Sequence, residues 1–542
     1  MKRRNFIKLT STASVMSLLP SEVFSMFKAV NALDCKQQLN GKKLVLIQLS
    51  GANDGLNTVV PLNQYDKYVA LRPTIRLKNT TEPNGVINLD TTLGINDQIG
   101  LHPSLTGFKS LYDSGKMRVI QGVGYPTMNG SHFKSTDLWH SGGDGTNRNF
   151  DLESGWLGRF LENHYEVSPQ DKFPLGVQLA GTANSSIFRA ENQPHNLNIT
   201  GQDPAGFYSV INGLGGPPPS NIPLSEYGDL IRYIIANDQQ TTAYAQAIST
   251  SFAKGKNIVT YPNTDLSNQL KTVARLISGG LETKVYLVTI SGWDTHDLQV
   301  ASASSPHTGG HANLLKTLSD AVNNFITDIN SQGLGGDVVA VTYSEFGRTP
   351  RENANLGTDH GRIAPMFVFG NPIAPGVSGT NVNLDEIIQA NGFQFKTVQH
   401  DYRRVFGTIL KNWLGSTEST LDLVFYDYTN NRGFGNMLIE GLIKPDHIAC
   451  DLGIVTALQE MPQDGIWLYP NPTTDIMTIA VANEIVKQVN ILTIEGKSVI
   501  EFSNNSDASN FVIDLAQVPN GFYISHIQTN LNQFSRRIIV RR

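Results

Sequence analysis

Cysteine is almost absent from this chain. Only Cys35 and Cys450 occur among 542 residues, too few for a disulfide framework, and their spacing leaves open whether they pair. Long apolar runs are also missing, because no stretch reaches the roughly 18 apolar residues of a spanning helix. We therefore expect no membrane-spanning segment and a fold held by its hydrophobic core.

Charge of either sign is scarce as well. Charged residues make up 16% of the chain and the net charge is -5, so nothing favours general binding to nucleic acid or to an anionic membrane. Hydrophobic residues make up 40%, which indicates a globular protein rather than a disordered one. The length suggests two or more domains.

The first residues have the layout of an export signal. Lys2, Arg3 and Arg4 precede a modestly apolar stretch from Leu9 to Pro20, as in secreted proteins. The adjacent arginines resemble a twin-arginine leader, and an ordinary secretory signal is the alternative. We expect residues 1–35 to direct export by either route.

Strands and helices alternate from about Lys42 to Leu442, the pattern of an α/β domain with a mostly parallel sheet. A Gly- and Pro-rich region at residues 144–223 predicts loop excursions over one end of that sheet. Buried strands are predicted at residues 43–49, 285–290, 338–343 and 364–369, and helices at residues 131–140, 311–329 and 401–414. Ligands of such sheets bind beyond the carboxyl ends of the strands.

Carboxylates and imidazoles follow three of these strands. Asn53-Asp54, Asp294-Thr295-His296 and Glu345 each come after an apolar run, and Asp359-His360 precedes the strand at 364–369. Such side chains suit a divalent ion, although Asp54 alone fits an Asx turn equally well and His307 or His311 could add a nitrogen. We predict a zinc, manganese, magnesium or calcium site with these ligands: Asp54, Asp294, His296, Glu345, Asp359 and His360.

Two further residues are candidates for catalysis. Ser131 lies at a predicted helix start, where backbone N–H groups favour negative charge, so it is a possible nucleophile or simply a helix cap. Arg348 could bind an oxyanion through paired donors or merely balance neighbouring carboxylates.

The order of these motifs resembles a family. The segments Gly51–Gly55, Ser131–Phe133, Gly292–His296, Ser344–Thr349 and Gly357–Gly361 are similar to those of an exported, uncharacterised family related to the alkaline phosphatase and sulfatase superfamily, over residues 42–415. This resemblance implies a three-layer α/β/α sandwich, with Asp54, Asp294, His296 and His360 as metal ligands and Ser131 as nucleophile. Phe346 stands where the superfamily usually has a His, so a two-metal site requires Asp359 or His132 to compensate.

The last part of the chain changes character after a linker expected at residues 443–465. Short β-rich runs separated by turn residues predict a small antiparallel sandwich over residues 466–542. The segments Trp467–Thr473 and Leu515–Tyr523 and the terminal Arg541-Arg542 resemble the C-terminal sorting domain of type IX secretion cargo. That resemblance implies secretion machinery as a partner and delivery across an outer membrane, to the cell surface or the medium.

The leading hypothesis is therefore an exported metal-dependent hydrolase of phosphate or sulfate esters. The competing hypothesis is a non-catalytic surface protein for binding or assembly, on a phosphatase-like fold that has lost its catalytic residues. A sugar-binding protein that stacks ligands on Trp139, Trp156 and Trp293 is a weaker third hypothesis, because aromatic residues make up only 8% of the chain.

Overall fold

The computed structural model describes most of the chain in two compact units, one within residues 34–452 and the other within residues 453–542. It describes residues 39, 41–146, 154–165, 172–179, 185–189, 196–199, 226–427, 432–433, 438–449 and, with short gaps, 466–540. The expected export signal, both cysteines and residues 450–465 of the expected linker lie outside these residues.

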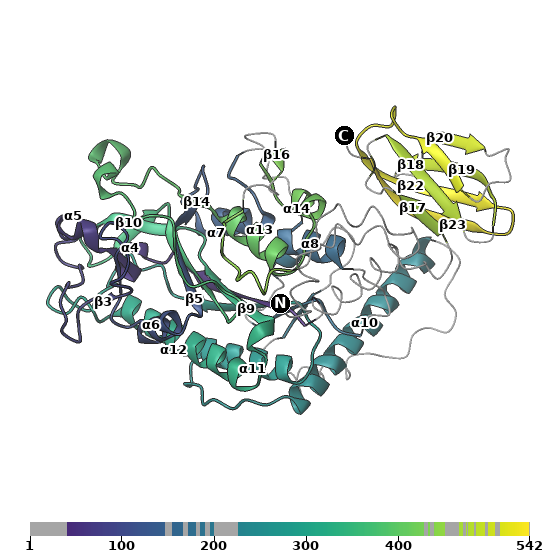
Figure 1. Ribbon diagram of the computed structural model, residues 1–542. Helices are drawn as coiled ribbons and strands as arrows, with labels where there is room; N and C mark the ends of the chain where they lie inside the picture. The colour runs from purple at the N-terminus through teal and green to yellow at the C-terminus, as the bar shows by residue number, and fades with distance from the viewer. Residues whose placement is uncertain are drawn as a thin grey trace, which may run out of the picture. The chain divides into compact units, whose positions relative to one another are not determined.

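The larger unit is built on a mixed sheet that is mostly parallel (Figure 1). In spatial order its strands are β13 (Gly376–Ser378), β5 (Met117–Gly124), β12 (Ala364–Phe369), β9 (Val338–Tyr343), β1 (Lys43–Ser50), β8 (Val285–Ser291), β6 (Gly176–Gln178) and β7 (Asn196–Asn198), and β14 (His400–Asp401) also pairs with β5. Among them β12 is antiparallel to both neighbours. The central strands β9, β1 and β8 are the three predicted apolar runs, and they are adjacent and parallel, so their carboxyl ends meet at one edge.

Helices cover both faces of the sheet. Along β1, Val45 and Ile47 point into one hydrophobic core while Leu44 and Leu46 point into the other, as the period of two in a strand requires. The first face is covered by α6 (Thr106–Asp113), α10 (Glu226–Lys254), α11 (Asp265–Ser278) and α12 (Gly310–Ser331), and the second by α7 (His132–Ser141), α8 (Trp156–His164), α13 (Tyr402–Asn412) and α14 (Glu418–Val424). The unit is thus a three-layer α/β/α sandwich, as predicted.

Part of the region expected to form only loop excursions belongs to this core. Trp156, Leu157 and Phe160 of α8 are buried, and β6 pairs in parallel with β8. The Gly and Pro content of residues 144–223 obscured these elements, because β6 and β7 have only three residues each and show no periodicity.

Smaller elements lie beyond the main sheet. They are α4 (Gly55–Thr58), α5 (Tyr65–Leu71), the sheet β2 (Val59–Pro61), β4 (Ile99–Leu101) and β3 (Ile87–Asn88), the hairpin β10 (Gly347–Glu352) and β11 (Thr358–Gly361), and the pair β15 (Tyr426–Asp427) and β16 (Arg432–Gly433). Short 3₁₀ turns occupy Leu62–Gln64, Ser186–Phe188, Gly335–Asp337, Leu384–Glu386 and Gln389–Asn391. The β10–β11 hairpin matters most for function, because it follows β9 and carries Arg348 and His360.

The C-terminal unit is all β, as predicted. One antiparallel sheet contains β17 (Ile466–Tyr469), β18 (Ile476–Val481) and β21 (Asn510–Asp514), and the other contains β20 (Ser498–Ser503), β19 (Val486–Thr493), β22 (Gly521–Thr529) and β23 (Gln533–Val540). Met477, Val489 and Ile538 belong to its own hydrophobic core. In the part of the chain that the structure describes, no helix is long and apolar enough to cross a membrane.

Candidate metal centre

The loops that follow β1, β8 and β9 meet at the carboxyl edge of the sheet. Gly51 makes this approach possible, because it has φ +119° and a Cβ there would lie 2.6 Å from the backbone nitrogen of Asp294. The Gly51 N–H donates to Oε1 of Glu345 at 2.8 Å. The three strand ends are therefore joined directly, and a side chain at position 51 would separate them.

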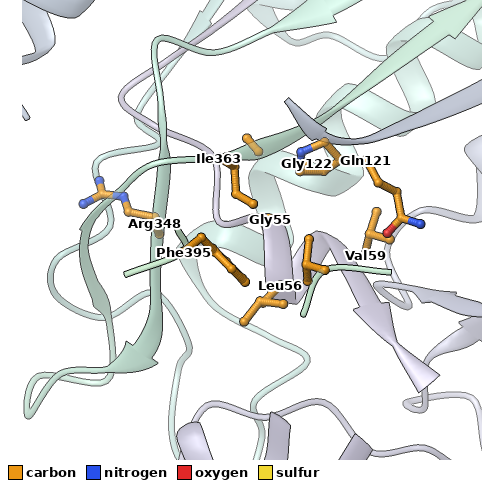
Figure 2. Close-up of a pocket in the computed structure, with 11 residues that line it drawn as sticks. Gly55, Leu56, Val59, Gln121, Gly122, Arg348, Ile363 and Phe395 are labelled. Carbon is orange, nitrogen blue, oxygen red and sulfur yellow. The ribbon is translucent and has the colours of Figure 1, made fainter. Parts of the chain in front are cut away.

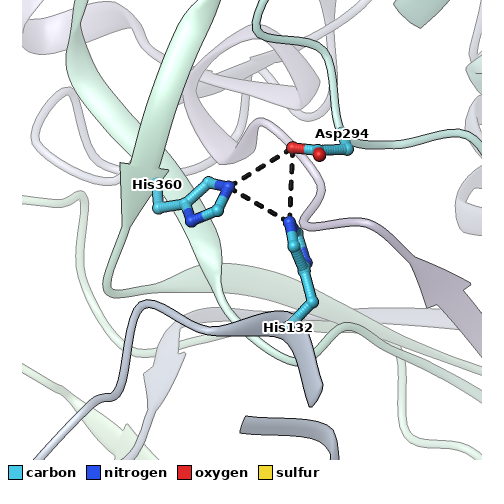
Figure 3. A group of neighbouring side chains, drawn as sticks. All are labelled: His132, Asp294 and His360. Atoms are coloured by element: carbon cyan, nitrogen blue, oxygen red, sulfur yellow. Dashed lines mark hydrogen bonds and ion pairs between the residues drawn. The ribbon is translucent and has the colours of Figure 1, made fainter. Parts of the chain in front are cut away.

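Two imidazoles and one carboxylate, those of His132, His360 and Asp294, converge above this edge (Figure 3), and a third imidazole, that of His296, lies beside them. Nε2 of His132 lies 3.1 Å from Nε2 of His360 and 3.3 Å from Oδ1 of Asp294. Nε2 of His296 lies 2.8 Å from Nε2 of His360 and 3.2 Å from the same oxygen. The described contacts thus form two triangles of donor atoms that share the pair Asp294 and His360, 3.3 Å apart.

The outer nitrogens of the imidazoles define their tautomers. Nδ1 of His360 faces the Gly130 carbonyl oxygen at 2.7 Å, Nδ1 of His132 faces Oε1 of Glu345 at 2.7 Å, and Nδ1 of His296 faces Oδ1 of Asp359 at 3.1 Å. Because oxygen acceptors hold the proton on Nδ1, each neutral ring directs an unprotonated Nε2 inward. Three lone pairs and a carboxylate oxygen then face one another, an arrangement that a cation stabilises.

The composition and spacing of these donors fit a transition-metal ion. In tetrahedral zinc sites the metal–nitrogen distance is about 2.1 Å, which separates neighbouring donor atoms by about 3.4 Å. The separations here, 2.8–3.3 Å, are close to that value. Imidazole-rich sites favour zinc and similar ions, whereas calcium and magnesium prefer oxygen ligands. The fit is therefore better for zinc than for the oxygen-preferring ions.

Arg348 orients the carboxylate of this cluster. Its buried guanidinium donates to Oδ1 of Asp294 and to the carbonyl oxygens of Ala52, Thr358, Gly51 and Trp293. Although partial burial acts to raise the pKa of Asp294, the hydrogen bond and charge of Arg348 lower it to about 2. Asp294 is consequently ionised at neutral pH. All of these hydrogen bonds of Arg348 go to oxygens of the protein itself. Its expected role in binding a substrate oxyanion therefore has no support in these contacts.

Glu345 and Asp359 contact the cluster from outside. Glu345 is 2% exposed and accepts hydrogen bonds from Gly51 and His132, and its hydrogen bond to His132 is the main cause of a raised pKa of that imidazole. Asp359 accepts from His296 and from Nδ2 of Asn353 at 3.2 Å. We had expected both as direct ligands, but the structure places each behind a histidine, where carboxylates orient metal-binding imidazoles.

Asp54 does not join the cluster, contrary to the expectation that it would share an ion with Asp294 and His360. Its side chain is fully buried and forms a two-point pair with Arg72, at 2.5 and 2.8 Å. Gln299 adds a third hydrogen bond at 2.6 Å. Burial acts to raise the pKa of Asp54, yet the charge and hydrogen bonds of Arg72 lower it. Both oxygens of this carboxylate therefore accept hydrogen bonds within a buried network.

His132 supplies the additional nitrogen. The sequence indicated it only as a residue that might compensate for Phe346, because a His at a helix start commonly has a structural role. Phe346 is buried and packs against the rings of His132 and His360, with centroids 4.8 and 4.9 Å apart. Phe346 thus supports two of the imidazoles.

Ser131 caps α7 and directly precedes His132. Its side chain is exposed and forms no capping hydrogen bond, while its backbone N–H donates to Asn129 at 2.8 Å. The hydroxyl group is therefore available. By contrast, His311 is buried and contacts Asn53 at 3.0 Å, so it does not reach the cluster, and His307 belongs to none of the cluster's described contacts.

The cluster opens into a cleft of about 490 Å³. Its lining includes His132, Asp294 and Glu345 of the cluster, the polar residues Gln48, Ser50, Thr136, Asp137 and Ser291, and also Phe133, Gly51 and Gly292. A second, much smaller pocket of about 20 Å³ lies beside Arg348 and is mostly apolar, with Leu56, Val59, Ile363 and Phe395 in its lining (Figure 2). The N–H groups of Arg348 point to protein acceptors, so the first cleft is the better candidate.

The tryptophans suggested for ligand stacking are unsuited to that role. Trp139, Trp156 and Trp293 are 2%, 0% and 0% exposed, and they pack within the hydrophobic cores. The interpretation as a sugar-stacking protein is therefore wrong for these three residues.

Comparison with known proteins identifies two regions. Residues 249–412 match a family described as a protein of unknown function, DUF1501. Residues 467–541 match the secretion system C-terminal sorting domain, so the chain carries this domain. The first match includes Asp294, His296, Glu345 and His360. No curated protein matches the chain.

Solved structures of the alkaline phosphatase superfamily match over much of the chain. A superfamily protein from Vibrio parahaemolyticus is 10% identical, with 92% of this chain and 82% of that chain covered and a TM-score of 0.29. PsFucS1 sulfatase from Pseudoalteromonas sp. is 12% identical, with 92% and 89% covered and a TM-score of 0.28. Alkaline phosphatase from the Antarctic bacterium TAB5 is 10% identical, with 65% and 98% covered and a TM-score of 0.26. The fold assignment rests on the strand order and layers described above.

Proposed function

We propose that this protein is an exported, metal-dependent hydrolase of phosphate or sulfate esters, with one ion held by His132, Asp294 and His360 and with His296 beside His360. The observation that carries the proposal is the convergence of the Nε2 atoms of His132 and His360 with Oδ1 of Asp294. Structural zinc sites have four protein ligands, whereas catalytic sites have three and keep one position open for water or substrate. The side chains of Asp294 and His296 are 47% and 42% exposed, which favours a catalytic site.

A bound divalent ion would stabilise negative charge on the ester and activate a nucleophile. Ser131 is the candidate nucleophile, since its hydroxyl forms no capping bond and adjoins His132 in the chain. The N-terminus of α7, where His132 is the first residue, favours the anionic group through its backbone N–H groups. Arg348 orients Asp294 for this task, and Glu345 and Asp359 orient His132 and His296.

The two ends of the chain support an extracellular place of action. The sorting domain at residues 467–541 fits delivery by secretion machinery to the cell surface or beyond, and residues 1–35 are proposed to be the first export signal. Zinc and ester substrates would then be taken from the surroundings of the cell.

The test begins with the mature protein loaded with Zn²⁺ or Mn²⁺ and passed through a desalting column. We expect about one ion per chain and turnover of aryl phosphate or aryl sulfate esters. Asp294→Ala should lose both the metal and the turnover, while Ser131→Ala should keep the metal and lose turnover by about two orders of magnitude or more. A wild-type protein that retains no divalent ion would contradict the proposal.

A non-catalytic surface protein is the second candidate, and the lining of the cleft favours it. Among the cleft residues Asp137, Asp294 and Glu345 are acidic, and none of the described residues that line the cleft is a Lys or Arg that could attract a polyanionic ester. This alternative predicts that the wild-type protein binds the ion but hydrolyses no ester in the panel, and that Ser131→Ala changes nothing measurable.

A further inference from the structure

A closed polar network lies beneath the open cluster. Asp54, Arg72 and Gln299 are each 0% exposed. Oδ2 of Asp54 accepts from Nη1 of Arg72 at 2.5 Å and from Nε2 of Gln299 at 2.6 Å. Fully buried charges and amides are retained only where their hydrogen bonds are satisfied, so this network has a defined geometry.

Gln299 connects the network to both segments that carry metal-binding residues. Its Oε1 accepts from Oγ1 of Thr358 at 2.7 Å and from Oγ1 of Thr295 at 3.2 Å. Thr295 lies between Asp294 and His296, and Thr358 lies two residues before His360. The Thr358 N–H also donates to the Thr295 carbonyl oxygen at 3.2 Å. One amide oxygen thus joins the loop after β8 to strand β11.

Arg72 fixes the network to the remaining segment. Besides Asp54, its guanidinium donates to the carbonyl oxygens of Pro350 at 2.7 Å and Thr349 at 2.8 Å and to Oδ1 of Asn57 at 2.8 Å. All five of its N–H groups therefore have acceptors. Since Thr349 and Pro350 follow Arg348 in β10, the loop after β1, the loop after β8 and the β10–β11 hairpin share one anchor.

We propose that Gln299, held by the Asp54–Arg72 pair, is a positioning residue that sets the separation of Asp294 and His296 from His360. The inference rests on the proposed metal site, and it gives Asp54 an indirect role in place of direct metal binding. These ligands lie at the ends of strands and in loops. Without the amide bridge, two segments would have to be ordered separately when an ion binds, which weakens binding.

Gln299→Met tests this role, because Met has a similar length and leaves the Asp54–Arg72 pair in place. Gln269→Met is the matched control. Gln269 is 3% exposed and also forms two side-chain hydrogen bonds, with the carbonyl oxygen and the N–H of Thr289, both at 2.9 Å. Both variants lose a buried, hydrogen-bonded amide, but Gln269 bonds only to Thr289 within β8, whereas Gln299 joins Thr295 to Thr358 beside the cluster.

The first measurement is amide hydrogen exchange in the metal-free full-length protein. We expect the amides of Thr358 and Asp359 to exchange at least tenfold faster in Gln299→Met than in the wild type, and to exchange at the wild-type rate in Gln269→Met. Equal rates in the wild type and Gln299→Met would overturn the inference. This result does not depend on metal binding, so it is separable from a failure of the proposed function.

The second measurement is Zn²⁺ affinity by competition with a chromophoric chelator. Outer groups of metal sites typically change affinity 10–100-fold, and we expect a loss of about tenfold for Gln299→Met. Gln269→Met should keep the wild-type Zn²⁺ affinity, even if its melting temperature falls as much as that of Gln299→Met. A Gln299→Met protein that is less stable but binds Zn²⁺ as tightly as the wild type would show a merely structural role and overturn the inference.

Discussion

Two aspartates at the carboxyl edge of one sheet have opposite surroundings. Asp54 and Asp294 each pair with a buried arginine, Arg72 and Arg348. The side chain of Asp54 is 0% exposed and both of its oxygens are used by the protein, whereas that of Asp294 is 47% exposed and faces imidazoles. Residue type and position at a strand end are therefore insufficient to identify a ligand. The partners of each oxygen decide whether a carboxylate can take a cation.

The closed pair should dominate stability. Asp54→Asn leaves the buried charge of Arg72 without its counterion, and removal of one partner of a buried pair costs about 3–5 kcal/mol. Urea unfolding of the metal-free protein measures this loss. Asp359→Asn, in the open cluster and 63% exposed, should change stability by less than about 1 kcal/mol. Equal losses of stability in Asp54→Asn and Asp359→Asn would contradict the inferred difference between the closed pair and the open cluster.

A buried histidine beside the closed pair predicts a pH effect. Burial is the main cause that lowers the pKa of His311 to about 4, against about 6.5 in an unfolded chain. The unfolded state therefore binds the proton first, and stability present above about pH 6.5 declines as the pH falls toward 4. At about 1.4 kcal/mol per pKa unit the decline amounts to about 3 kcal/mol.

His311→Gln isolates this contribution from that of other acidic groups. The difference in unfolding free energy between wild type and variant, measured by urea titration at pH 7 and at pH 4.5, should shrink at the lower pH. A difference that is the same at both values would mean that His311 does not titrate as inferred.

The open cluster should instead dominate metal binding. His360→Ala removes a donor whose Nε2 lies within 3.3 Å of three other donor atoms, so Zn²⁺ affinity should fall at least about 100-fold, or about 2.7 kcal/mol. Because the side chain of His360 is partly exposed, at 26%, its removal should cost less stability than loss of the fully buried Asp54 charge. His307→Ala provides the control imidazole and should bind as the wild type does. Isothermal titration with Zn²⁺ separates these outcomes.

The outer carboxylate should have the smallest effect. Asp359→Asn keeps an oxygen that accepts from His296 but removes its charge, so we expect about a tenfold loss of Zn²⁺ affinity, at the lower end for outer partners. The same chelator competition measures it. A loss as large as that of His360→Ala would indicate that Asp359 binds the ion directly, as the sequence first suggested.

Much of the fold and part of the site could be predicted from the sequence. The apolar runs of β1, β8 and β9 define the sheet, and the polar end of β8 predicted Asp294 and His296 at one edge. His360 was predicted there because it precedes the strand at 364–369. The β-rich tail could be predicted equally well, although Ile466–Tyr469 was treated only as part of a motif and not as a strand.

The remaining features depend on contacts that no sequence pattern records. Arg72 directly follows α5 and belongs to no sequence motif. It meets Asp54 only because the chain turns back through α4 and α5. Glu345 and Asp359 could not be assigned as outer partners, since that depends on the ring orientations of His132 and His296. A shift of a few ångströms in the position of a carboxylate decides whether it binds an ion or a histidine.

The most direct test of the central claim is X-ray absorption spectroscopy of the zinc-loaded protein. The account predicts a first shell at about 2.0–2.1 Å that contains two imidazole nitrogens and a carboxylate oxygen. This shell should lose one imidazole in His132→Ala and should be unchanged in Asp54→Asn. A shell without imidazoles, or one that changes in Asp54→Asn and not in His132→Ala, would contradict it.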